Sequence, residues 1–200
     1  MITLKTRLIL ASQSPRRKSL LKLLEVPFEV HPSNTPEIWP DDLEAAEAVE
    51  LLAHQKANEI AALNPNELVL GADTVVILDG EVLGKPESPA DACAMLKRLS
   101  GRTHSVTTGL ALIHAASGRA VTTHVTTGVT FAELTPEEIA RYVDSRSPMD
   151  KAGSYGIQDD TGALFVRRIE GDYYNVVGLP VRCLYELLRT SFSDLVEQPS

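Results

Sequence analysis

The sequence predicts a mixed α/β fold, in which a mixed sheet is flanked by helices. Short apolar runs typical of buried strands alternate with longer segments of helical periodicity. A stretch rich in valine and threonine, from His104 to Leu134, is typical of antiparallel strands. No boundary between domains is visible. We therefore expect one domain over residues 1–192, folded as two lobes around a cleft, and a flexible tail over 193–200.

The composition excludes several classes of protein. Hydrophobic residues make up 44% of the 200 residues, charged residues make up 23%, and the formal net charge is −8. This balance argues against a general nucleic-acid binder or a binder of anionic membranes. Two cysteines do not make a disulfide framework, and no stretch has the length of a membrane span. We expect a soluble, cytoplasmic protein that engages neither nucleic acid nor membrane.

The first predicted unit is a strand over residues 8–10, a loop, and a helix with Ser14 as N-cap and Pro15 at its first position. Three consecutive cations, residues 16–18, fall in the first helical turn. The helix dipole disfavours cations there by roughly 0.3–1 kcal/mol each. A bound phosphate would reverse the sign of this effect, so the pattern indicates a phosphate-binding turn. A solvated surface turn is the alternative.

The later elements are predicted from apolar periodicity and from the residues at their ends. Asp79-Gly80 is a hairpin signal, Ser88-Pro89 opens a helix, and Thr135 begins a capping box with Glu138. Pro180 opens the last helix. The predicted strands are 28–30, 68–78, 81–83, two or three within 104–134, 164–169 and 173–177; the predicted helices are 41–63, 88–101, 135–145 and one from 179.

Asp73 lies in the middle of the apolar strand 68–78. A carboxylate there is unfavourable unless it is paired, bound to metal or protonated, which indicates a functional role. The alternative is a residue on the exposed face of an edge strand. Lys56 in the long helix and Lys85 after the hairpin are further candidates, although each could also be a solvated lysine.

The segment 148–158, PMDKAGSYGIQ, has two glycines that allow its backbone to approach a ligand. Tyr155 and Gln158 could stack on a nucleobase and read its edge. The five histidines show no metal-ligand spacing, and there is no Gly-x-x-x-x-Gly-Lys-Ser/Thr loop.

Six segments occur in one order along the chain: LASQSPRRKSLL, the helix with Lys56, GADTVVILDGEVLGKP, LSGRTHSVTTG, PMDKAGSYGIQ and VVGLP. This set resembles the Maf family of nucleoside triphosphate pyrophosphatases from about Leu8 to Leu188. The resemblance implies a fold similar to inosine triphosphate pyrophosphatase. It also implies cleavage of a nucleoside triphosphate between the α- and β-phosphates, a divalent cation (Mg²⁺ or Mn²⁺), and a homodimer.

The resemblance also implies roles for particular residues. Arg16, Thr74 and Gln158 match the branch that hydrolyses dTTP and UTP, and Asp73 matches the proton acceptor. The expected phosphate-binding residues are Ser12, Ser14, Arg17, Lys56 and Lys85. Glu37 and Asp73 are the expected metal ligands. Family members often have an acidic pair in the loop after the second strand, whereas Asn34-Thr35-Pro36-Glu37 keeps only one acid here.

Two other functions stay open at the level of sequence. One is a pyrophosphatase for modified purine triphosphates, which removes them from the nucleotide pool. The other is a nucleotide-binding regulator of septum formation, a process with which the Maf family is associated. The family's enzymatic residues, Asp73 and Lys85 above all, argue against a protein that only regulates.

Overall fold

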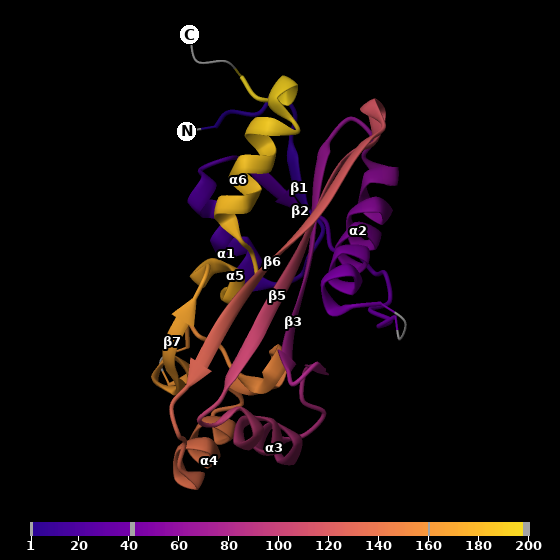
Figure 1. The fold of residues 1–200 in the computed structure, drawn as a ribbon. Helices are drawn as coiled ribbons and strands as arrows, with labels where there is room; N and C mark the ends of the chain where they lie inside the picture. Colours follow the sequence, from indigo (N-terminus) through magenta and orange to yellow (C-terminus); the bar gives the residue numbers. More distant parts are fainter. Residues whose placement is uncertain (1, 41–42, 160, 198–200) are drawn as a thin grey trace. The chain divides into compact units, whose positions relative to one another are not determined.

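The fold is mixed α/β, as the sequence predicts. A computed structural model describes residues 2–40, 43–159 and 161–197, and within them one sheet has the strand order β2-β1-β3-β5-β6-β7, with β4 paired to β3 (Figure 1). The strands are β1 (Leu8–Leu10), β2 (Phe28–Val30), β3 (Leu68–Leu78), β4 (Glu81–Leu83), β5 (Thr103–His114), β6 (Arg119–Phe131) and β7 (Val166–Glu170). The helices are α1 (Pro15–Leu21), α2 (Ala45–Leu63), α3 (Pro89–Leu99), α4 (Pro136–Asp144), α5 (Tyr173–Val177) and α6 (Val181–Thr190).

The chain divides into two compact units. The first comprises Met1–Asp73, Thr108–Val125 and Gly178–Ser200, and the second comprises Thr74–Thr107 and Thr126–Val177. Strands β3, β5 and β6 contribute residues to both units. The cleft that the resemblance implies stays a prediction.

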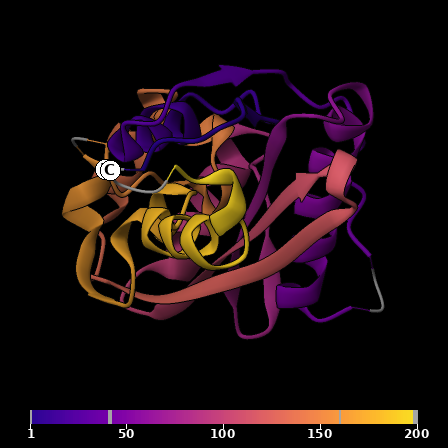
Figure 2. The ribbon, with the colours of Figure 1, turned by 90° about the horizontal axis from the view of Figure 1, so that it is seen from above.

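The first unit is built around the parallel strands β1, β2 and β3. Leu8 is paired with Phe28 on one side and with Leu68 on the other. All three residues of β1 are fully buried, as expected for a parallel strand covered on both faces. Helices α2 and α6 cover opposite faces of this part of the sheet (Figures 1 and 2).

Helix α2 lies unusually close to the sheet. A Cβ atom at Gly71 of β3 would lie 2.2 Å from the carbonyl oxygen of Ala53, and one at Gly109 of β5 would lie 2.3 Å from that of Val49. Alanines on the buried face of α2, among them Ala57, pack at the same interface. The helix can therefore approach the strands only because both glycines lack a side chain.

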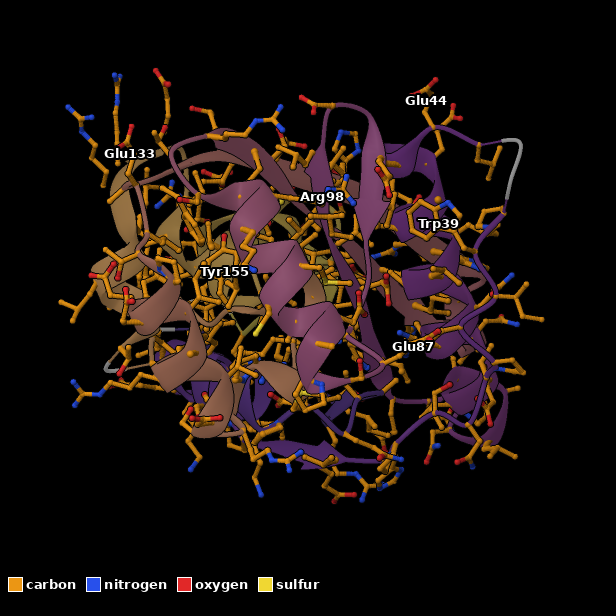
Figure 3. All side chains as sticks on the ribbon, turned by 90° about the horizontal axis from the view of Figure 1, so that it is seen from below. Trp39, Glu44, Glu87, Arg98, Glu133 and Tyr155 are labelled. Atoms are coloured by element: carbon orange, nitrogen blue, oxygen red, sulfur yellow. The ribbon has the colours of Figure 1, made fainter. Side chains whose placement is uncertain are left out.

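The second unit contains the antiparallel pairs. Strand β4 pairs with the end of β3, and β7 pairs with β6 with Val129 opposite Ile169. Helices α3 and α4 pack against each other. Aromatic rings fill the interior, and Tyr155, labelled in Figure 3, lies edge-on to both Phe131 and His104.

Three predicted elements are present in the structure with different bounds. The apolar pattern of the first helix continues to Leu24, but α1 ends at Leu21 and Lys22–Leu24 forms a 3₁₀ turn. The strand predicted from residue 164 begins at Val166, because Gly162–Phe165 forms another 3₁₀ turn. The predicted start of the long helix at residue 41 lies outside the described residues, and α2 begins at Ala45.

The strand predicted over 173–177 is wrong, because these residues form helix α5. The carboxylate of Asp172 accepts a hydrogen bond from the backbone N–H of Tyr174, which caps the start of the helix. Within the helix, the buried amide of Asn175 donates to the carbonyl of Val106 and to Thr127 Oγ1. These contacts are distant in sequence, so the local alternation of residues could not reveal them.

The chain end also differs from the expected tail. Ser193–Leu195 forms a 3₁₀ turn, and Val196 forms a β-bridge with Leu4. The carboxylate of Asp194 is bonded to Arg119. Residues 198–200 of the expected tail lie outside the described residues.

We predict that Gly71→Ala destabilises the first unit by about 2 kcal/mol or more, because the new methyl group would push α2 away from the sheet. Urea unfolding followed by circular dichroism measures the change. The matched control is Gly84→Ala, where a Cβ meets nothing within 4 Å. Equal stability of the two variants would contradict the close approach of α2.

Candidate active site

The candidate site in the first unit is centred on Lys56. Its Nζ donates to Asp73 Oδ1 and to Glu37 Oε1, both at 2.6 Å. The side chains of Lys56 and Asp73 are only 9% and 11% exposed, whereas that of Glu37 is 54% exposed. Asp73 is therefore a paired, buried carboxylate and not a residue on an exposed strand face, and Lys56 is not a solvated lysine.

A buried ion pair of this kind is weak evidence for stability. Removing both charges from water carries a penalty that their attraction often fails to recover. Such a pair on a strand that is otherwise apolar is more readily explained by chemistry at the site. The close approach of α2 to β3 at Gly71 brings Lys56 within reach of Asp73.

The first helical turn holds a second group of polar residues in the same unit. Ser14 is the N-cap of α1, and its Oγ accepts a hydrogen bond from the backbone N–H of Arg17 at 3.4 Å. The Arg17 side chain donates from Nε to the carbonyl of Gly178 at 2.9 Å and from Nη1 to Ser12 Oγ at 3.3 Å. The guanidinium is thus held by Ser12 and Gly178, which both belong to the first unit.

The charges of these two groups interact. Burial lowers the pKa of the Arg17 guanidinium, while the negative charges of Asp73 and Glu37 act in the opposite direction. Arg16, which is half-buried beside it, lowers the pKa of Arg17 further. The first turn of α1 holds no acidic residue. The cationic turn and the buried carboxylate that the sequence analysis singled out therefore belong to one electrostatic site.

The loop before Glu37 is held by Glu59, a residue not predicted from the sequence. Glu59 Oε2 accepts hydrogen bonds from the hydroxyls of Ser33 and Thr35 and from the backbone N–H groups of Asn34 and Thr35. These bonds, that from Ser33 above all, lower the pKa of Glu59. Glu59 follows Lys56 by three residues, so a helix places both on one face, and this spacing was the available signal.

Glu37 and Asp73 fit a divalent cation. Both carboxylates reach the same ammonium, so their oxygens lie close together, and Mg²⁺ and Mn²⁺ prefer oxygen ligands. Across residues 2–40, 43–159 and 161–197, no cluster of three or more His, Cys, Asp or Glu side chains could hold a metal ion. The protein would thus contribute two carboxylates, and the substrate's phosphates and water would complete the coordination.

The remaining predicted site residues belong to the second unit. Thr74, which directly follows Asp73, is half-buried, and Lys85 and Gln158 are exposed. That these three act together with the first unit stays a prediction. Tyr155, a candidate for stacking on a base, is only 5% exposed inside the aromatic cluster, so it offers no stacking face.

An acidic side chain next to Gln158 was also missed. Asp159 Oδ1 accepts a hydrogen bond from Gln158 Nε2 at 3.1 Å. Its Oδ2 accepts from Tyr142 at 2.8 Å and from Ser147 at 2.5 Å, and it lies 3.3 Å from the Lys151 ammonium. Together with Gln158, these four residues form a connected polar cluster, which we call the Asp159 cluster. Lys151 stands in the segment 148–158, but nothing local identified its partner.

The sequence is similar to those of known proteins. The sequence profile of a family described as Maf-like protein matches residues 7–191. This chain therefore belongs to the Maf family, as the ordered segments predicted.

Several curated relatives carry one name, dTTP/UTP pyrophosphatase. The relative from Salinibacter ruber is 54% identical over 200 residues, which are 100% of this chain and 98% of that protein. The relative from Moorella thermoacetica is 53% identical over 183 residues, covering 92% of this chain and 94% of that protein. The one from Bacillus pumilus is 50% identical, covering 92% and 96%.

Among solved structures, a HAM1 protein from Coxiella burnetii aligns with a TM-score of 0.46 at 19% identity, covering 94% of this chain and 99% of that one. The Staphylococcus aureus Ham1 protein aligns with a TM-score of 0.44 at 16% identity, covering 64% and 73%. Of the helices in the described residues, none combines the length and apolar character needed to cross a membrane.

Burial of His104 makes the stability of the second unit depend on pH. Burial lowers its pKa from 6.5 to about 4, and its Nε2 is 2.8 Å from the Tyr155 hydroxyl. Between pH 6.5 and pH 4 the His104 imidazole is protonated in the unfolded chain but neutral in the folded one. The contribution of His104 to the free energy of unfolding is therefore fully present above pH 6.5 and is lost as the pH falls to 4. We predict a loss of about 3 kcal/mol from this residue.

The measurement is urea unfolding at pH 7, 6, 5 and 4 for the wild type and for His104→Gln, which does not titrate. Carboxylates titrate in both proteins, so the difference between the two curves isolates His104. Parallel curves would show that His104 is not held neutral in the folded state.

Proposed function

We propose that this protein is a nucleoside triphosphate pyrophosphatase that hydrolyses dTTP and UTP to the nucleoside monophosphate and pyrophosphate. Curated relatives with at least 50% identity carry the name of that activity. The observation that carries the proposal is the buried Lys56, bonded to Asp73 and Glu37 in the same unit as Arg17. Such an arrangement places a carboxylate that can accept a proton close to cations that can bind phosphate groups.

In this proposal Arg17 and Lys56 bind the phosphate chain. Arg17 is already oriented by Ser12 and Gly178, so little side-chain freedom is lost when an anion binds. The hydroxyls of Ser12 and Ser14 and the N–H groups of the first helical turn donate further hydrogen bonds. Lys85 adds a cation from the second unit. These groups stabilise the negative charge that builds on the leaving pyrophosphate.

Asp73 is the proposed general base. Lys56 fixes Asp73 Oδ1, and the carboxylate can accept a proton from water that attacks the α-phosphorus. Glu37 and Asp73 would hold the divalent cation, Mg²⁺ or Mn²⁺. When bound, the cation supplies charge neutralisation on the phosphate oxygens. The lysine keeps the two carboxylates together against their mutual repulsion.

Three residues are the proposed readers of the base. Thr74 and Gln158 hydrogen-bond the O4/N3 edge of uracil or thymine, and Arg16 completes the set. A site built around such bonds rejects a base that leaves its polar groups unpaired. We also propose that the enzyme acts in the cytoplasm and that it forms a homodimer, the latter as the family resemblance implies.

The first test is a nucleotide panel assayed for pyrophosphate with Mg²⁺ and with Mn²⁺. We predict that dTTP and UTP are the preferred substrates. We predict further that Asp73→Asn lowers turnover by about 10²–10⁴-fold while the fold survives, because the proton acceptor is lost.

The matched control is Asp79→Asn, in the hairpin turn that follows β3. Asp79 has a positive φ of 54°, which asparagine tolerates, and its carboxylate is bonded to Arg102. Full turnover by a folded Asp73→Asn protein would refute the base assignment. Preference for modified purine triphosphates, or no turnover of any triphosphate, would refute the proposed substrate.

The second test concerns the readers of the base. We predict that Arg16→Ala and Gln158→Ala each lower the preference for dTTP over other nucleotides on the order of ten-fold, since a hydrogen bond to the base is lost. The ratios of kcat/KM across the panel give the result, and thermal melting shows whether stability is unchanged. An unchanged substrate ranking in both variants would contradict the assignment.

A further inference from the structure

Gln158 alone cannot distinguish uracil from cytosine. Its side-chain amide carries an acceptor, Oε1, and a donor group, Nε2, and a rotation of 180° exchanges them. Uracil and thymine present N3–H as a donor beside O4 as an acceptor, whereas cytosine presents N3 as an acceptor beside an N4 donor. An amide that rotates freely can pair with either edge.

The structure provides a neighbour that fixes this rotation. Gln158 Nε2 lies 3.1 Å from Asp159 Oδ1. An ionised carboxylate only accepts hydrogen bonds, so it selects the Nε2 side of the amide and repels Oε1. One N–H of the amide is thereby used, and the exposed side chain keeps a single donor–acceptor order for a ligand.

The carboxylate of Asp159 is itself held in place by hydrogen-bond donors and an ammonium group. Tyr142, Ser147 and Lys151 all approach Oδ2, so the carboxylate cannot move away without losing three favourable contacts. Lys151 is only 10% exposed and also donates to the Ser147 carbonyl. The loop closes tightly on this cluster, since a Cβ at Gly156 would lie 2.7 Å from Asp159 Oδ2.

We infer that Asp159 is a specificity-determining positioning residue, which orients the Gln158 amide so that its Oε1 accepts from N3–H of uracil or thymine and excludes cytosine. The inference rests on the proposed function, because it assigns the way in which that site selects its base. Asp159 acts through Gln158 and does not touch the reacting atoms.

Asp159→Asn tests the inference. The three donors at Oδ2 would select the oxygen of the new amide, which turns its NH₂ group toward Gln158. Gln158 then has to present Oε1 to that group and Nε2 to the ligand. We expect the ratio of kcat/KM for dTTP over dCTP to fall by at least about ten-fold, with part of the change a gain in activity on dCTP. A merely structural residue would lower both activities together.

Three further variants keep the result interpretable. Asp150→Asn removes the other acidic partner of Lys151, at 2.8 Å, and should leave the ratio unchanged. In a Gln158→Ala background, Asp159→Asn should no longer alter the ratio, because the residue it orients is gone. Circular dichroism and thermal melting verify that each variant is folded, and Asp159→Ala, which frees the amide to pair with either edge, should lower the ratio less than Asp159→Asn does.

Binding supplies a readout that does not need turnover. Calorimetric titration with α,β-methylene-UTP and α,β-methylene-CTP measures the same preference in the wild type and in Asp159→Asn. A shift in binding without any turnover of dTTP or UTP would refute the proposed activity and support the role of Asp159. An unchanged ratio in Asp159→Asn, or an equal change in the Gln158→Ala background, would overturn the inference.

Discussion

The site in the first unit depends on how closely helix α2 approaches the sheet. Gly71 and Gly109 leave no room for a side chain, and the backbone of α2 fills the space. A lysine has a fixed reach, so a helix displaced outward by the width of a methyl group would carry Lys56 away from Asp73. The same two glycines, on neighbouring strands, therefore allow both the close packing of α2 and the placement of the Lys56 charge beside Asp73.

The charges at this site are arranged so that both cations, Lys56 and Arg17, experience the negative charges of Asp73 and Glu37. Lys56 is shared by two carboxylates, and Arg17 is held by neutral oxygens while it experiences the same two negative charges. A polyanion that binds here, as proposed, would therefore meet cations that are already oriented. The free energy needed to order them was spent when the unit folded, not when the ligand binds.

Local signals in the sequence predicted much of the fold. The Ser14 and Thr135 caps and the Asp79-Gly80 turn are each determined by a few adjacent residues, and all appear in the structure. Helix α5 was mistaken for a strand because Asn175 bonds to residues far away in sequence. Asp73 and Arg17 stood out because their charges contradict their surroundings, whereas Lys56 alone could equally have been a solvated lysine. Glu59 and Asp159 did not stand out, since acidic residues near helices and in loops are ordinary until their partners are known.

If Gln158 reads the base as proposed, its hydrogen bond to Asp159 has a consequence for damaged nucleotides. An edge read only at the N3 and O4 positions is insensitive to the group at C5 of the ring, so uracil, thymine and their C5-modified analogues look alike to it. Deamination of cytosine replaces the N4 amine by an oxygen and puts a proton on N3. One hydrolytic lesion would therefore turn a nucleotide that this amide rejects into one that it accepts.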